Sequence, residues 1–167
     1  MERYGGRMWA ERAGWRERIP LCAPAHRGRL KMLQILLAED NHGDVLLVQQ
    51  ALAEHRLPHK LHVVRDGEEA LRFMAHMGQP GQMPCPDILL LDLNLPKIDG
   101  PRVLREFRKH PECTYTPVIV VTSSDTPDDR ARVDALGISR YFRKPSDLDA
   151  FLQLGAVVRQ VVEEAAA

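Results

Sequence analysis

One aspartate follows a short apolar run in the middle of the chain. Residues 88–91 are all branched and apolar, and they are too few for an isolated helix, so they predict a strand buried on both faces. Asp92 stands directly after this run, residues 94–96 interrupt it, and residues 99–100 predict a turn. Open parallel sheets place their ligand crevice at the carboxyl ends of the strands. Asp92 is therefore the first candidate for a reactive or metal-binding side chain.

Three further strand-like runs also end on residue types that phosphate or metal chemistry uses. Carboxylates bind hard cations, while a hydroxyl or an amine can bind phosphate oxygens. If these runs are parallel strands of one sheet, the polar residues meet at the same edge as Asp92. The runs and the residues that follow them are 33–38 with Glu39 and Asp40, 117–121 with Thr122, and 138–143 with Lys144.

Taken in order, these residues resemble the receiver domain of two-component response regulators. The residues that carry the resemblance are Glu39-Asp40, Asp92, Thr122 and Lys144-Pro145, and the similarity covers about residues 32 to 163. Within receivers, residues 37–41, residues 92–97 and the long stretch before Pro86 are similar to the stand-alone regulators that partner phytochrome-type sensor kinases. Five separated positions agree, which makes the receiver assignment specific.

Five strands that alternate with five helices are predicted over this region, which favours a doubly wound parallel α/β sheet with helices on both faces. The resemblance implies the flavodoxin-like strand order 2-1-3-4-5, with strands one and three side by side at the topological switch point. Asp66 and Thr126 are expected to cap helices, Asp99 to cap a helix or form a turn, and Ser146 to open the last helix with a capping box. The remaining expected elements are a strand at 61–64 and helices at about 44–56, 66–78, 100–110, 126–137 and 146–163, the last with Leu148, Phe151, Leu152 and Val158 facing inward.

Charge divides the chain into two unequal parts. Residues 1–31 carry eight Lys and Arg against three Glu, a net charge of +5, so the remainder carries −5. We expect residues 1–31 to be a poorly ordered basic extension, residues 32–163 the receiver domain and residues 164–167 a tail. Alternatives for the extension are a short helix from about Met8 to Arg18, an upstream start ahead of Met32, or an arm that contacts RNA or an acidic partner. Nucleic-acid binding is the less favoured of these, because no nucleic-acid-binding fold accompanies the arm.

Several carboxylates in one crevice repel one another, so some must take up protons or a cation must be present. A hard ion that accepts few protein ligands, Mg²⁺, suits such a site. The resemblance implies that Asp40, Asp92 and the backbone carbonyl of Asn94 bind the ion directly and that Glu39 binds it through water.

The resemblance also implies that Asp92 is the phosphoacceptor. It would take a phosphoryl group from a kinase phosphohistidine, while Lys144 and the Thr122 hydroxyl bind phosphoryl oxygens. Thr122 and Tyr141 are the implied switch residues, since in the family the hydroxyl moves toward the phosphoryl group and the aromatic ring swings inward. Tyr141 has the alternative of being a half-exposed strand residue that does not move.

Cysteine and hydropathy patterns bear on the compartment. No apolar run approaches the roughly 18 residues of a membrane span, and the N-terminus lacks a signal-peptide pattern. Cys22, Cys85 and Cys113 are odd in number and contain no Cys-x-x-Cys, so we expect reduced thiols rather than a disulfide framework. These features favour a soluble, cytoplasmic protein without a membrane partner.

Two other classes of protein could share parts of this pattern. A haloacid-dehalogenase-like phosphohydrolase also uses a strand-end aspartate, but it expects a second aspartate two residues later, where this chain has Asn94. A degenerate receiver or a flavodoxin-like nucleotide carrier would be a binding module, but no Gly-x-Gly-x-x-Gly or Walker loop is present. We therefore expect a non-enzymatic regulator whose partners are a sensor histidine kinase and a downstream protein. A homodimer through the last helix is a further option.

Overall fold

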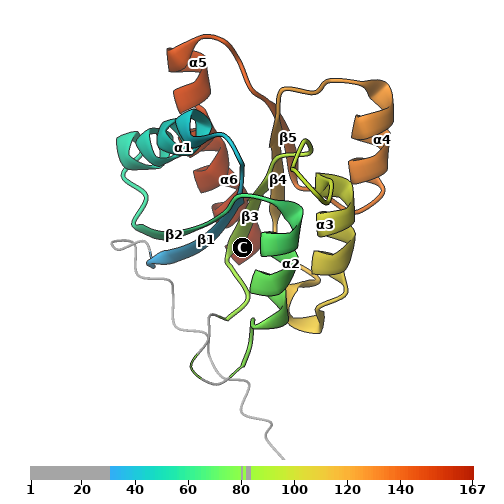
Figure 1. Ribbon diagram of the computed structural model, residues 1–167. Coiled ribbons are helices and arrows are strands. Elements are labelled where there is room, and N and C mark those ends of the chain that lie inside the picture. The colour runs from blue at the N-terminus through green and yellow to red at the C-terminus, as the bar shows by residue number, and fades with distance from the viewer. Residues whose placement is uncertain (1–30, 80, 82–83) are drawn as a thin grey trace, which may run out of the picture.

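The apolar runs form five strands of one parallel sheet (Figure 1). Their order is β2-β1-β3-β4-β5, which confirms the order implied by the family resemblance. β1 and β3 lie side by side, with Ala38 opposite Leu91 at their carboxyl ends. The strands are β1 (Leu33–Ala38), β2 (His59–Val64), β3 (Ile88–Leu91), β4 (Val118–Thr122) and β5 (Arg140–Arg143).

The computed structural model describes residues 31–79, 81 and 84–167. Most of the predicted basic extension, including the possible helix from Met8 to Arg18 and Cys22, lies outside the described residues. Among the residues that are described, no helix combines the length and the apolar character needed to cross a bilayer.

Helices cover both faces of the sheet. α1 packs with α5 and α6 on one face, while α2, α3 and α4 cover the other. α5 and α6 are separated only by Gln153, whose backbone is still right-handed helical, so together they correspond to the fifth predicted helix. The helices are α1 (His42–Glu54), α2 (Gly67–Ala75), α3 (Gly100–Arg108), the short 3₁₀ helix η1 (Pro111–Cys113), α4 (Pro127–Asp134), α5 (Leu148–Leu152) and α6 (Leu154–Ala166).

The central strand β3 is buried on both faces, as its uninterrupted apolar run predicts. Ile88 and Leu90 pack against the α1, α5 and α6 side, whereas Leu89 and Leu91 pack against the α2 and α3 side. Because successive side chains of a strand point to opposite faces, four apolar residues are enough to join both layers of the core. The residue that follows them, Asp92, therefore lies at the carboxyl-terminal edge of a strand that is packed on both faces.

Several predicted helix caps are confirmed. The side chain of Asp66 accepts the N–H of Glu69, Asp99 accepts that of Arg102, and Thr126 accepts that of Asp129. These side-chain oxygens satisfy backbone donors that a helix leaves unpaired at its first turn.

Two helix starts differ from the prediction. α1 begins at His42, two residues early, because the side chain of Asn41 accepts the N–H groups of Gly43 and Asp44. The last helix is capped by Asp147 rather than Ser146, since the Asp147 carboxylate accepts the N–H of Ala150. Leu148, the first residue of α5, is 48% exposed, so its predicted inward position is wrong. Phe151, Leu152 and Val158 are buried as expected, and α6 continues through the residues predicted as a tail up to Ala166.

The expectation of reduced thiols is wrong for two of the cysteines. Cys85, in the loop before β3, and Cys113, in η1, form a disulfide with a Cα–Cα distance of 5.6 Å. The two residues are 28 positions apart, so no local Cys-x-x-Cys spacing could reveal the pair. The fold brings them together at the amino-terminal edge of the central strands, opposite the edge that carries Asp92.

Candidate functional site

Three acids meet at the carboxyl ends of β1 and β3. Glu39 and Asp40 follow β1, Asp92 follows β3, and the Asp92 N–H donates to the Ala38 carbonyl at 2.9 Å. One carboxylate oxygen from each of the three residues lies within 4.8 Å of the others. Glu39 and Asp92 are buried, while Asp40 is exposed at the rim. The sequence prediction that these side chains converge is confirmed, and we call the three residues the acidic cluster.

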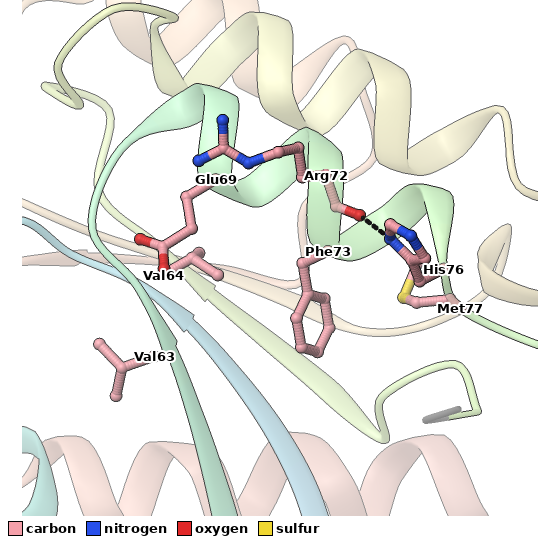
Figure 2. Close-up of a pocket in the computed structure, with 7 residues that line it drawn as sticks. All are labelled: Val63, Val64, Glu69, Arg72, Phe73, His76 and Met77. Carbon is pink, nitrogen blue, oxygen red and sulfur yellow. Dashed lines mark hydrogen bonds between the residues drawn. The ribbon is translucent and has the colours of Figure 1, made fainter. Parts of the chain in front are cut away.

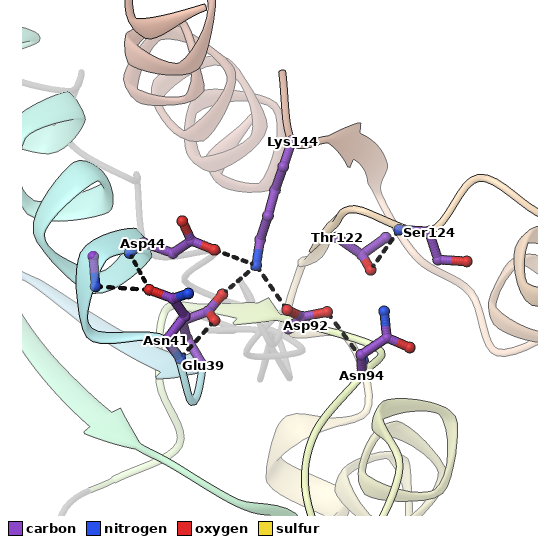
Figure 3. Close-up of polar contacts among 9 residues, drawn as sticks. Glu39, Asn41, Asp44, Asp92, Asn94, Thr122, Ser124 and Lys144 are labelled. Atoms are coloured by element: carbon purple, nitrogen blue, oxygen red, sulfur yellow. Dashed lines mark hydrogen bonds and ion pairs between the residues drawn. The ribbon is translucent and has the colours of Figure 1, made fainter. Parts of the chain in front are cut away.

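Lys144 reaches this cluster from the end of β5. Its Nζ lies 2.7 Å from Glu39, 2.8 Å from Asp44 and 2.7 Å from Asp92 (Figure 3). The lysine side chain is only 8% exposed. Its backbone N–H donates to the Thr122 carbonyl at 2.8 Å, which holds the lysine beside the end of β4.

The site is short of positive charge. One lysine faces the acidic cluster and Asp44, that is, four carboxylates. Burial raises the pKa of Glu39 above its ordinary value, against the opposing effect of its bond to Lys144. Burial also disfavours the charged form of Lys144, but its bonds to the three carboxylates outweigh this and raise its pKa. Oxygen donors with excess negative charge, close enough to share one ion, fit a hard divalent cation.

Backbone N–H groups hold the carboxylates of Asp92 and Glu39 in place. The N–H of Asn94 donates to Oδ1 of Asp92 at 3.0 Å, and the N–H of Asn41 donates to Oε1 of Glu39 at 3.0 Å. Gly100 packs so closely that a Cβ there would meet the Asp92 carbonyl and would lie 2.6 Å from the Cα of Leu93. A glycine at this position therefore allows the chain to return against the base of the site.

Thr122 lies across Asp92 from Glu39 (Figure 3). It is fully buried at the end of β4, and its Oγ1 accepts the N–H of Ser124 at 3.2 Å. The Ser124 hydroxyl donates to Asp129 at 2.5 Å, and the Thr126 hydroxyl donates to the same oxygen at 2.8 Å. These two hydrogen bonds lower the pKa of Asp129. The loop after β4 is thus held to the first turn of α4.

Tyr141 is linked to the same loop. Its hydroxyl donates to the Ser124 carbonyl at 2.8 Å, and the guanidinium of Arg130 lies 4.7 Å from the centre of its ring. Burial raises the pKa of the tyrosine hydroxyl. The predicted switch residues Thr122 and Tyr141 therefore both contact Ser124.

Sequence reasoning missed some residues that complete the site. Asp44 pairs with Lys144 although the two are 100 residues apart, and Arg130 covers Tyr141. Asp44 occupies the first turn of α1, where an acid is common for reasons of helix stability alone, so its position carried no distinctive signal. Asn94, predicted to offer its carbonyl to a metal, is exposed beside Asp92.

A separate hollow lies between β2 and α2 (Figure 2). It measures about 310 Å³, and the acidic cluster does not contribute to its lining. The Nδ1–H of His76 donates to the Arg72 carbonyl at 2.7 Å, so this imidazole nitrogen is already bonded within α2. The lining residues are Val63, Val64, Glu69, Arg72, Phe73, His76 and Met77. The carboxylates and the lysine that could bind a cation or a phosphoryl group lie together at the acidic cluster and not in this hollow.

Comparison with known proteins identifies the family of this chain. Residues 35–155 match the family described as "Response regulator receiver domain". The chain is 40% identical over 114 residues to response regulator Rcp1 of Synechocystis sp., an overlap of 68% of this chain and 78% of that protein.

Solved structures give the same result. The phosphorylated cyanobacterial phytochrome response regulator RcpA is similar with a TM-score of 0.73 and 35% identity, covering 82% of this chain and 98% of that one. The Mn²⁺-bound form of response regulator Rcp1 is similar with a TM-score of 0.68 and 35% identity, covering 77% and 92%.

Proposed function

The chain belongs to the response regulator receiver family, and from this premise we propose that Asp92 accepts a phosphoryl group from the phosphohistidine of a sensor kinase. The single observation that carries the proposal is the shared position of Asp92: it is at once a member of the acidic cluster and a partner of Lys144. A carboxylate between a cation-binding group and an amine has both neighbours that a transferring phosphoryl group requires. The phosphorylated state of the relative RcpA supports the proposal.

We propose Mg²⁺ as the cation. Asp40, Asp92 and the Asn94 carbonyl would hold it, with Glu39 acting through water. When bound, the ion would neutralise charge on the phosphoryl oxygens during transfer. The oxygen-only donor set and the Mn²⁺-bound relative Rcp1 support a hard divalent ion.

In the proposed reaction, a carboxylate oxygen of Asp92 attacks phosphorus as the bond from phosphorus to the imidazole nitrogen breaks. The imidazole leaves with that electron pair and takes a proton from solvent, and an aspartyl phosphate is formed. Lys144 exchanges its bond to Asp92 for one to a phosphoryl oxygen, and the Thr122 hydroxyl turns from Ser124 to bind another. The chain therefore modifies itself and turns over no separate substrate.

We propose that signalling follows through protein contacts of the receiver surface. A turn of Thr122 toward the phosphoryl group would release its bond to the Ser124 N–H, and Ser124 also holds the Tyr141 hydroxyl. The rearranged loop and Tyr141 would then offer a changed surface to a downstream protein. We also propose a homodimer through α6, where Val157 and Val162 pack against the core but are only half-buried.

We propose a phytochrome-type sensor kinase as the partner and a cytoplasmic location for the chain. Similarity to the phytochrome response regulator RcpA supports the kinase type. We propose residues 32–163 as the receiver domain, preceded by a basic extension over residues 1–31.

The test is phosphotransfer from radiolabelled phytochrome-type and other histidine kinases to the full chain. We expect transfer to the wild type in Mg²⁺, with label that is lost in alkali, and none to Asp92→Asn. An Asp99→Asn variant is the matched control, because Asp99 also follows β3 but caps α3. Stoichiometric label on Asp92→Asn would refute the assignment.

A further inference from the structure

Lys144 has three carboxylate partners, but only one of them is outside the proposed chemistry. An ammonium group has three N–H donors, and here they point to Glu39, Asp44 and Asp92 at 2.7 to 2.8 Å (Figure 3). Glu39 belongs to the acidic cluster, and Asp92 is the proposed phosphoacceptor. Of the three partners, only Asp44 is neither part of the acidic cluster nor the proposed phosphoacceptor.

From this arrangement we infer that Asp44 is a positioning residue: it holds Lys144 in the site while the lysine exchanges Asp92 for a phosphoryl oxygen. The inference rests on the proposed function of Asp92. During the exchange, the bond from Lys144 to Asp92 must break, and Glu39 would be engaged with the cation. The bond to Asp44 can persist throughout, so the lysine does not have to be ordered again for each transfer.

The geometry of Asp44 exceeds what helix stability requires. Asp44 lies in the first turn of α1, where an acid interacts favourably with the helix dipole wherever its side chain points. In a capping box, an acid at this position would accept the backbone N–H of the cap residue, but here the N–H of Asn41 donates to Glu39. The Asp44 carboxylate is instead directed at Lys144, and its side chain is 25% exposed.

The contact also joins distant parts of the chain. It links the first turn of α1 to the residue after β5, across a sequence separation of 100 residues. Ordering a lysine side chain costs conformational entropy. Because Asp44 already holds Lys144 in place, less of this entropy has to be lost during phosphoryl transfer.

The first arm of the test measures the contact itself, without phosphorylation. The full chain is treated with acetic anhydride in saturating Mg²⁺, and the rate of Lys144 acetylation is followed by peptide mass spectrometry. In Asp44→Asn, we expect Lys144 to react at least threefold faster than in wild type, whereas Lys97 should react at an unchanged rate. Equal Lys144 rates in the two proteins would overturn the inference.

The second arm measures the effect on the reaction. With acetyl phosphate and saturating Mg²⁺, we expect Asp44→Asn to be phosphorylated about tenfold more slowly, the scale of one lost hydrogen bond to a charged group. Asp44→Glu should recover part of the rate. Asp149→Asn, which removes an exposed acid from the first turn of α5, is the matched control and should match wild type.

A double-variant comparison separates positioning from a general effect of charge. If Asp44 acts through Lys144, then adding Asp44→Asn to Lys144→Ala should change the phosphorylation rate less than twofold. A full tenfold effect in that background, or none in the wild-type background, would overturn the inference. Failure of the proposed function would look different: the wild type itself would remain unlabelled at Asp92, while the acetylation arm would still report whether Asp44 protects Lys144.

Discussion

Replacing Lys144 with methionine removes the only ammonium group seen among the described residues at the acidic cluster. The lysine side chain is 8% exposed, and its partners Glu39 and Asp92 are 2% and 7% exposed. Removing one member of a buried ion pair typically costs about 3–5 kcal/mol, because the remaining charge is left unpaired. We expect a loss of about 3 kcal/mol in the free energy of unfolding when divalent ions are chelated. Methionine keeps most of the side-chain volume, so the loss reports charge rather than a cavity.

Mg²⁺ should restore much of this loss. Without the lysine, the acids attract a divalent cation more strongly, and we expect the variant to bind Mg²⁺ at least tenfold more tightly than wild type. Tenfold tighter binding corresponds to about 1.4 kcal/mol, which would appear as extra stabilisation at high Mg²⁺. Urea unfolding in chelator and in Mg²⁺, with linear extrapolation, measures both quantities.

Lys97→Met is the matched control for this experiment. Lys97 also contacts two acids, Asp66 at 2.7 Å and Glu68 at 3.3 Å, but its side chain is 49% exposed. Its replacement should have a smaller effect, and one that Mg²⁺ does not change. Our reasoning is that Lys144 and Mg²⁺ neutralise the same carboxylates. It would be refuted if the loss in the free energy of unfolding of Lys144→Met did not depend on Mg²⁺, or if the variant bound Mg²⁺ no more tightly than wild type.

Three further predictions concern the surroundings of the site. Gly100→Ala should lower the free energy of unfolding by about 1–3 kcal/mol and slow phosphorylation, because the added methyl group overlaps the backbone at Leu93. Ser124→Ala should raise the pKa of Asp129, which a carboxylate NMR titration measures. In wild type this pKa is lowered, so the ionised Asp129 stabilises the fold above the ordinary aspartate pKa. This stabilisation is lost as the pH falls through the lower pKa of the folded state. Cys85→Ser should destabilise by about 2–4 kcal/mol and make stability insensitive to reductant.

Each of these has an outcome that would count against it. Wild-type stability and phosphorylation in Gly100→Ala would mean that the backbone beneath Asp92 can move freely; Gly43→Ala, where the nearest atom to an added Cβ is 3.1 Å away, is the milder control. An unchanged Asp129 titration would show that Ser124 does not donate to it. Two free thiols at Cys85 and Cys113, found by alkylation without reductant, would contradict the disulfide.

Much of the fold could be predicted because the pattern is local. Each apolar run, each cap at Asp66 and Thr126, and the polar residue after each strand can be identified from a few neighbouring residues. The prediction of a buried β3 needed only four apolar residues bounded by polar ones. The strand order came from the family resemblance rather than from the runs themselves.

The features that were missed depend on contacts across the fold. The bond of Asp44 to Lys144 spans 100 residues, and the disulfide of Cys85 with Cys113 spans 28, so neither has a local spacing that could predict it.

The one-residue error at the start of α5 arose because Ser146 and Asp147 are both good cap residues, and the structure uses the aspartate.

Direct identification of the modified residue tests the central claim, which is that acids at the ends of β1 and β3 prepare Asp92 for phosphorylation. The full chain is incubated with acetyl phosphate in Mg²⁺ or in chelator, then reduced with borohydride, which converts an aspartyl phosphate to homoserine that peptide mass spectrometry can locate. We predict homoserine at position 92 in Mg²⁺ and unmodified Asp92 in chelator. Homoserine at another aspartate, or equal modification of Asp92 without divalent ions, would contradict the account.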